Sequence, residues 1–176
     1  ATLYMLLVSA LGILLHRYTR QARFCLGTVS ANRHGAALQQ VVGFLATTLP
    51  LPIRIDDTAT VGDVVANCIE SVRGVFAHTD VGFVEIVQAC DSGRVEGVSP
   101  LFQVMFAFHN FPRQLTGDPF DSSTADAGGS ATFVTERVAV EADRAKFWLS
   151  LHLRPVEEGL SGVWQYRRDI LGAHTI

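Results

Sequence analysis

The chain has 176 residues, of which 48% are hydrophobic and 18% are charged, and a mean hydropathy of +0.26. These values predict one globular domain with a sizeable core and exclude a disordered chain. A net charge of -3, a pI near 6.1 and the lack of any run of Lys or Arg exclude the charge pattern that binds nucleic acid or an anionic membrane surface, so we expect neither as a partner.

The cysteines and the first apolar segment indicate the compartment. Cys25, Cys68 and Cys90 are too few and too widely spaced for a disulfide framework or a zinc site, and one of them must stay unpaired. The most apolar window, Thr2–Leu15, is shorter than the roughly 20 apolar residues of a membrane-spanning helix. Nothing basic precedes it, unlike in a signal peptide. We therefore expect a cytoplasmic protein with no metal site.

The first predicted element is a helix over Leu3–Tyr18. Its early part is apolar on every face, which is typical of a buried helix. A chain that opens on such a helix leads us to expect that something belonging upstream of it has been removed or sits on another chain.

Two strands are predicted next. Phe24–Val29 reads as a strand that leads into a polar turn at 32–35, and Val41–Ile55 reads as a second, mostly apolar strand region. Pro50 and Pro52 cannot donate hydrogen bonds to a neighbouring strand, so we expect a bend, a bulge or an edge position there.

Two helices follow. Thr60–Asp63 fits a capping box, and apolar residues then recur at helical spacing up to Phe76. A shorter helix is expected over Phe83–Ala89, with Asp80 as a residue that could open it.

The C-terminal half is predicted to be mostly strands. Leu101–Phe108 alternates, which places Phe102, Val104, Phe106 and Phe108 on one face. A polar loop rich in Gly and Pro spans 110–130. Three further strands are expected over Thr132–Val140, Lys146–Arg154 and Leu160–Arg167, the last two joined by a hairpin at 155–159. The element order predicts an α/β fold: a mixed β-sheet with helices packed on at least one face.

No complete active site can be read from residue types alone. The sequence has no Gly-x-Ser-x-Gly elbow, no phosphate-binding glycine loop and no His-Glu-x-x-His pattern. His78 precedes Asp80, but its place after a helix favours a helix-capping role. His109 reads as an exit from a strand into solvent, and His152 lies on the less apolar face of a strand.

Several stretches nevertheless resemble one family, the condensation domains of nonribosomal peptide synthetases, in the family's order. Residues 11–20 (LGILLHRYTR) and 27–33 (GTVSANR) look like the helix and strand that precede the family's central tunnel region. Residues 42–51 (VGFLATTLPL) are similar to the motif (I/V)GxFVNTLPLR, and residues 78–83 (HTDVGF) to HQDVPFE. Residues 94–106 resemble RDxSRNPLFQVMF, and 146–149 (KFWL) resemble KFDL.

This resemblance implies amide-bond formation between an acyl or peptidyl thioester on one carrier protein and an aminoacyl group on the next. It implies a two-lobed, chloramphenicol-acetyltransferase-like fold, of which residues 1–176 would be the C-terminal lobe and 111–130 a mobile loop crossing towards the N-terminal lobe. The family's catalytic motif, HHxxxDG, is absent, because no histidine here is followed four residues later by Asp. The chain alone is therefore expected to be inactive, with no catalytic residue of its own.

The resemblance also suggests site residues and partners. Asn32, Arg33 and Thr47, with Gln103 beside them, are the candidates for contact with the substrate tunnel or the other lobe. The implied partners are the N-terminal lobe, upstream and downstream peptidyl carrier proteins and an adjacent adenylation domain. No cofactor is bound directly, since the substrates travel on the phosphopantetheine of the carriers.

Departures from the motifs keep other hypotheses open. Pro52 stands where the family has Arg, and Gly82 where it has Pro, so a tuned, divergent or inactive parent domain fits as well. The alternatives are a noncatalytic scaffold or carrier-protein docking lobe, and an epimerisation-type or CoA-dependent acyltransferase relative.

Overall fold

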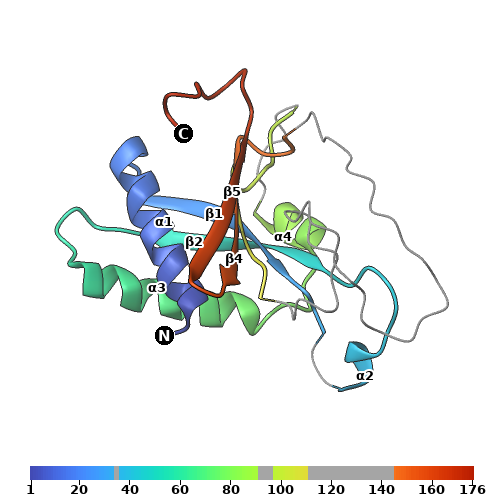
Figure 1. Cartoon of the computed structure of the whole chain (residues 1–176). Coiled ribbons are helices and arrows are strands. Elements are labelled where there is room, and N and C mark those ends of the chain that lie inside the picture. Colours follow the sequence, from blue (N-terminus) through green and yellow to red (C-terminus); the bar gives the residue numbers. More distant parts are fainter. Residues whose placement is uncertain (34–35, 91–96, 111–144) are drawn as a thin grey trace.

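A five-stranded mixed sheet forms the centre of the computed structural model, which describes residues 1–33, 36–90, 97–110 and 145–176 (Figure 1). The strand order is β2-β1-β3-β4-β5. β1 pairs with β3 and β3 with β4 in parallel, whereas both outer pairs are antiparallel. The strands are β1 (Arg23–Ser30), β2 (Thr47–Arg54), β3 (Val104–Phe108), β4 (Leu149–Val156) and β5 (Gly159–Tyr166). The predicted mixed α/β architecture is confirmed.

Four helices accompany the sheet in the described part of the chain: α1 (Leu3–Thr19), α2 (Ala36–Gln39), α3 (Val61–Phe76) and α4 (Phe83–Ala89). α1 and α3 lie together on one face of the sheet and α4 lies on the other, while the short α2 projects beyond the sheet (Figure 1). None of these helices is long and apolar enough to cross a bilayer.

The main core lies between the sheet and the pair α1 and α3. It is built from alternate strand residues and one stripe of each helix: Val8, Leu11, Leu26, Leu51, Ile53, Val64, Cys68, Val72, Phe106 and Leu151. Tyr4 ties α1 to this face, because its hydroxyl lies 2.8 Å from Thr28 Oγ1, and burial raises the pKa of Tyr4 to about 12.

A second, smaller packing layer covers the opposite face. A side chain at Gly27 would point away from Leu26, and the ring of Phe102 fills that space. Phe102 also contacts Phe83 of α4 and Phe147. The prediction that Phe102 shares a face with Phe106 is wrong, because β3 begins only at Val104 and the alternation does not extend before it.

Helix α1 matches the predicted span but is not buried on every side. Leu3, Leu6 and Leu14 are each more than two-fifths exposed, and they share the side that faces away from the sheet. The prediction of an all-round buried helix is therefore wrong for this chain.

Strand β2 is shorter than predicted. It begins at Thr47, because residues 41–46 form a loop instead of extending the strand. Its pairing with β1 runs without a bulge, and it lies at the edge of the sheet. Of the three predicted ways to accommodate Pro50 and Pro52, the edge position is the one that occurs.

The local signals of helix ends and turns are mostly confirmed. Thr60 Oγ1 accepts from the Asp63 N–H at 3.2 Å, and Asp63 Oδ2 accepts from the Thr60 N–H at 2.9 Å, which is the predicted capping box. Helix α4 has the predicted bounds, but it opens at Gly82 and not at Asp80. β4 and β5 form the predicted hairpin, since Val156 pairs with Gly159. The predicted loop at 111–130 and the predicted strand Thr132–Val140 lie outside the described residues.

Candidate functional site

One edge of the sheet gathers most of the polar candidates. Because β1 and β3 are parallel, the residues that follow them emerge on the same side, and the antiparallel β2 begins there too. Asn32 and Arg33 follow β1, His109 follows β3, and Thr47 opens β2. We call this group of four residues the carboxyl edge.

Asn32 turns the chain away from β1. Its φ of 50° is in the left-handed region, which Asn tolerates better than most residues. The Asn32 N–H donates to Ser30 Oγ at 3.2 Å, and Ser30 is paired with Thr47 across the two strands. Asn32 and Thr47 are therefore neighbours, as expected, and the backbone role of Asn32 is turn formation.

Arg33 holds the loop that leads to β2. One guanidinium nitrogen donates to the carbonyls of Leu38 at 2.9 Å and Val41 at 2.6 Å, and the other donates to the Gly43 carbonyl at 3.0 Å. A planar guanidinium can satisfy several carbonyls at once in a way that an ammonium group cannot. We call residues 38–44 the Arg33 loop. These bonds hold the loop outside the sheet, and the pairing of β2 with β1 ends at Ser30 and Thr47.

Gln103 does not lie beside the other three candidates, so that prediction is wrong. Gln103 precedes β3 and therefore lies at the other end of the strands, about 17 Å away along the five residues of β3. Its side-chain amide donates to the Ser99 carbonyl at 3.0 Å. This bond makes Gln103 an organiser of the turn before β3.

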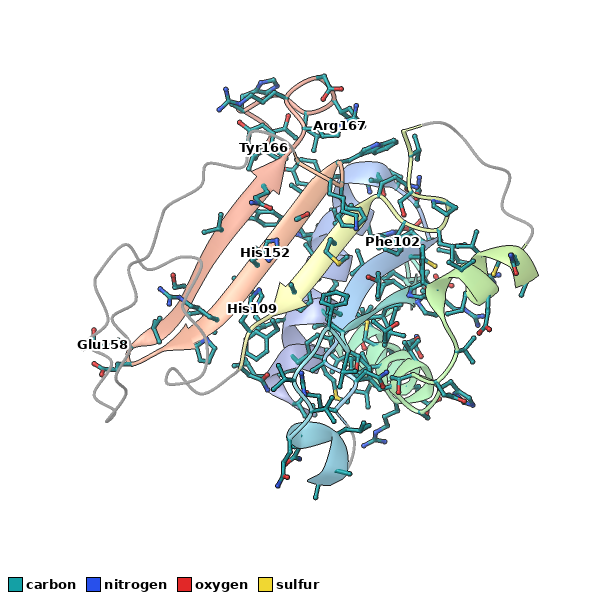
Figure 2. The ribbon with its side chains drawn as sticks, turned by 90° about the vertical axis from the view of Figure 1, so that its right-hand side faces the viewer. Phe102, His109, His152, Glu158, Tyr166 and Arg167 are labelled. Atoms are coloured by element: carbon teal, nitrogen blue, oxygen red, sulfur yellow. The ribbon has the colours of Figure 1, made fainter. Side chains whose placement is uncertain are left out.

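At the carboxyl edge, His109 pairs with a histidine of the neighbouring strand, His152 of β4. His109 Nε2 lies 3.3 Å from His152 Nδ1, and the two rings stack with centroids 5.6 Å apart and planes 15° apart (Figure 2). The backbone N–H of His109 donates to the Leu153 carbonyl, which aligns the end of β3 with β4. Because the bond needs one protonated and one bare nitrogen, the two rings cannot both be imidazolium while it exists.

Burial lowers the pKa of both histidines, and for His152 the nearby His109 lowers it further. The sequence by itself gives no sign that the two residues meet. Alternation does place each of them on the face opposite the core, but only the pairing of Ala107 with His152 brings them together.

His78 has the structural role that its position predicted. Its Nδ1 lies 2.8 Å from the carbonyl of Gly74 in the last turn of α3. Across residues 1–33, 36–90, 97–110 and 145–176, no three side chains of His, Cys, Asp or Glu come together as metal ligands.

Comparison with known proteins identifies the family. The family model described as "Condensation domain" matches residues 1–176. The chain belongs to the condensation domain family. This confirms the resemblance drawn from the motifs.

The relatives of this condensation-domain chain are nonribosomal synthetases. It is 29% identical over 175 residues to a linear gramicidin synthase from Brevibacillus parabrevis, covering 99% of the chain and 3% of that protein. It is 30% identical over 178 residues to phosphinothricin tripeptide synthetase PhsC of Streptomyces viridochromogenes, covering 100% of the chain and 15% of that protein. The chain thus spans a small part of these relatives.

Solved structures share the fold of this condensation-domain chain. The four-domain nonribosomal peptide synthetase holo-AB3403 matches with a TM-score of 0.81 and 21% identity, over 99% of this chain and 14% of that one. The X-domain from teicoplanin biosynthesis matches with a TM-score of 0.77 and 22% identity, over 99% of this chain and 38% of that one. The first condensation domain of the CDA synthetase matches with a TM-score of 0.70 and 16% identity, over 99% of this chain and 36% of that one.

Proposed function

We propose that this chain is the C-terminal lobe of a condensation domain that joins a carrier-bound acyl or peptidyl thioester to a carrier-bound amino acid. The observation that carries the proposal is the family match over all 176 residues. Peptide synthetases among its relatives support the same interpretation. The proposed setting is a cytoplasmic synthetase with carrier proteins and an adenylation domain as neighbours.

The assignment to one lobe has separate support. The chain aligns with 36% of the first CDA condensation domain and 38% of the teicoplanin X-domain, so each of those chains contains more sequence than has a counterpart here. The sequence also has no His followed four residues later by Asp. We infer that the general base is supplied by the remaining lobe.

The proposed reaction transfers an acyl group from sulfur to nitrogen. The amine nitrogen of the acceptor attacks the thioester carbonyl carbon, the C–N bond forms, the C–S bond breaks, and the proton lost by nitrogen leaves with the thiol. In this scheme the carboxyl edge of the present chain orients substrate or contacts the other lobe. Arg33 acts there as a positioning residue, because its donors are engaged by the loop carbonyls.

Reconstitution with loaded carrier proteins tests the proposal. The complete condensation domain that contains this chain should convert a donor-loaded and an acceptor-loaded carrier to the amide, detected on the acceptor carrier by mass spectrometry. The 176-residue chain alone should give no product. Amide formed by the chain alone would overturn the one-lobe assignment, and none from the complete domain would overturn the activity.

A second function has one specific observation in its favour. The X-domain of teicoplanin biosynthesis, whose structure is known in a complex with OxyB, matches this chain with a TM-score of 0.76. A docking lobe that recruits another enzyme would have the same fold. Two observations would distinguish such a docking lobe. It would bind a separate enzyme of its pathway in a titration and give no amide product, and the HHxxxDG motif in the sequence upstream would be degraded.

A further inference from the structure

The Arg33 loop presents large apolar side chains to solvent. Val42 is 100% exposed and Phe44 is 91% exposed, and Leu38 and Val41 in the same loop are about two-fifths exposed. From residue 35 to residue 53 the sequence contains no charged side chain. A cluster of this kind is typical of a surface that another protein segment covers.

The loop is held in shape while its side chains face outward. Three hydrogen bonds from Arg33 fix the carbonyls of Leu38, Val41 and Gly43, and the N–H of Val41 donates to the Leu38 carbonyl at 3.4 Å. Gly43 has a φ of +155°, a backbone conformation that residues with a Cβ rarely adopt, so this turn favours glycine. The exposure of Val42 and Phe44 therefore belongs to an organised loop.

The position of the loop indicates what covers it. It joins β1 to β2 at the carboxyl edge and projects beyond the sheet with α2 (Figure 1). Condensation and X-domain structures that match this chain contain well over half of their length outside the match. A partner recognised by charge would need free cationic or anionic groups, and Arg33, the charged side chain that holds the loop, is engaged by the loop carbonyls.

We propose that Val42 and Phe44 are the apolar anchors by which the rest of the condensation domain packs against the carboxyl edge, with Arg33 as the positioning residue. This inference rests on the proposed function, in which the chain is one lobe of that domain. It adds the surface through which the two lobes meet. The occupant is a segment of the same synthetase, and not a carrier protein or a second copy of this chain.

Cysteine labelling in the complete condensation domain tests the inference. Val42→Cys and Val61→Cys form a matched pair, since Val61 on α3 is 67% exposed. We expect the thiol at position 42 to react with a maleimide at least about tenfold more slowly than the thiol at 61, because packing shields it. The rates are read on separate peptides by mass spectrometry, so the native cysteines do not interfere. In urea, which unfolds the domain, the thiols at positions 42 and 61 should react at equal rates, and this ratio is the reference for the folded domain.

Each other outcome overturns the inference. Equal labelling of both positions in the folded domain means that nothing covers the loop. Protection only when a carrier protein is added, or only at high domain concentration, assigns the loop to a carrier or to a second copy. As a second readout, Phe44→Ser should lower the denaturation midpoint of the complete domain, whereas Val61→Ser should leave it unchanged.

Amide formation separates this inference from the proposed function. If the domain makes product while position 42 labels freely, the anchor is wrong and the activity stands. If position 42 is protected but no product forms, the anchor stands and the activity is wrong.

Discussion

His109 and His152 form a stacked, hydrogen-bonded imidazole pair, with 3.3 Å between His109 Nε2 and His152 Nδ1. The two residues are 43 positions apart and meet because β3 and β4 lie side by side in the sheet. Burial disfavours the protonated form of each ring. The pair therefore makes the stability of the fold depend on pH.

We predict that the pair destabilises the fold at acid pH. Above about 6.5, the ordinary histidine pKa, both rings are neutral in the folded and unfolded chains and the pair costs nothing. As pH falls below 6.5, the unfolded chain binds protons that the folded chain resists, so the free energy of unfolding falls until the lowered folded pKa values are passed. Urea unfolding between pH 5 and 8 measures this slope.

The variant His109→Gln/His152→Thr should have a flatter pH profile than the wild type over that range. His174→Gln, at an exposed position near the C-terminus, is the matched control and should keep the wild-type slope. Identical slopes for the double variant and the wild type would show that the pair does not carry the effect.

Gly27 should not tolerate a methyl group. A Cβ at this position would lie 2.1 Å from the ring of Phe102, which is itself only 1% exposed and cannot move into solvent. Gly27→Ala should therefore lower the free energy of unfolding by about 1–3 kcal/mol. Gly74→Ala, in α3 with nothing within 4 Å, should instead raise it by about 0.5–1 kcal/mol. Partial rescue of Gly27→Ala by Phe102→Leu would assign the loss to this contact.

The hydrogen bond between Tyr4 and Thr28 should show coupling in a double-mutant cycle. Tyr4→Phe leaves the buried Thr28 hydroxyl without this partner and should cost about 1 kcal/mol. Thr28→Val should cost a similar amount, and the double variant should cost less than the sum. Additive losses would mean that the bond contributes nothing.

The hydroxyl of Tyr4 should also ionise at a higher pH than an exposed tyrosine. Its pKa is raised to about 12 from 10, so the stability that depends on neutral Tyr4 is complete below pH 10 and is lost as pH rises from 10 towards 12. Tyrosinate absorbance of the wild type minus that of Tyr4→Phe isolates this one titration. A difference curve centred at 10 would contradict the burial of the hydroxyl.

Loss of the Arg33 clamp should loosen the Arg33 loop without unfolding the chain. Arg33→Gln removes donors to the carbonyls of Leu38, Val41 and Gly43, so thermolysin should cleave in the loop about tenfold faster. Arg54→Gln, at an exposed position on β2, is the control and should leave that rate unchanged. Unchanged cleavage in Arg33→Gln would show that the guanidinium does not hold the loop.

Much of the fold could be predicted from the sequence because its signals are local. The capping box of Thr60 and Asp63 involves residues three positions apart, and the spans of α1, α3 and α4 follow from apolar spacing within each helix. The motif resemblance identified the family in the same way, from short stretches in order. Asn32 and Thr47, two of the four candidate site residues, lie next to Ser30, and their contact with substrate or the other lobe stays a prediction.

What the sequence alone determined is thus the spans of α1, α3 and α4, the hairpin of β4 and β5, and the family. The tertiary structure decided the contacts between distant segments. Val41–Leu45 has the apolar composition of a strand, yet it lies in a loop whose Val41 and Gly43 carbonyls accept from the Arg33 guanidinium. His109 and His152 became a pair, and Gln103 was placed at the other edge, only through the pairing of β3 with β1 and β4. Periodicity records which face a residue occupies, whereas strand order and register decide which residues meet.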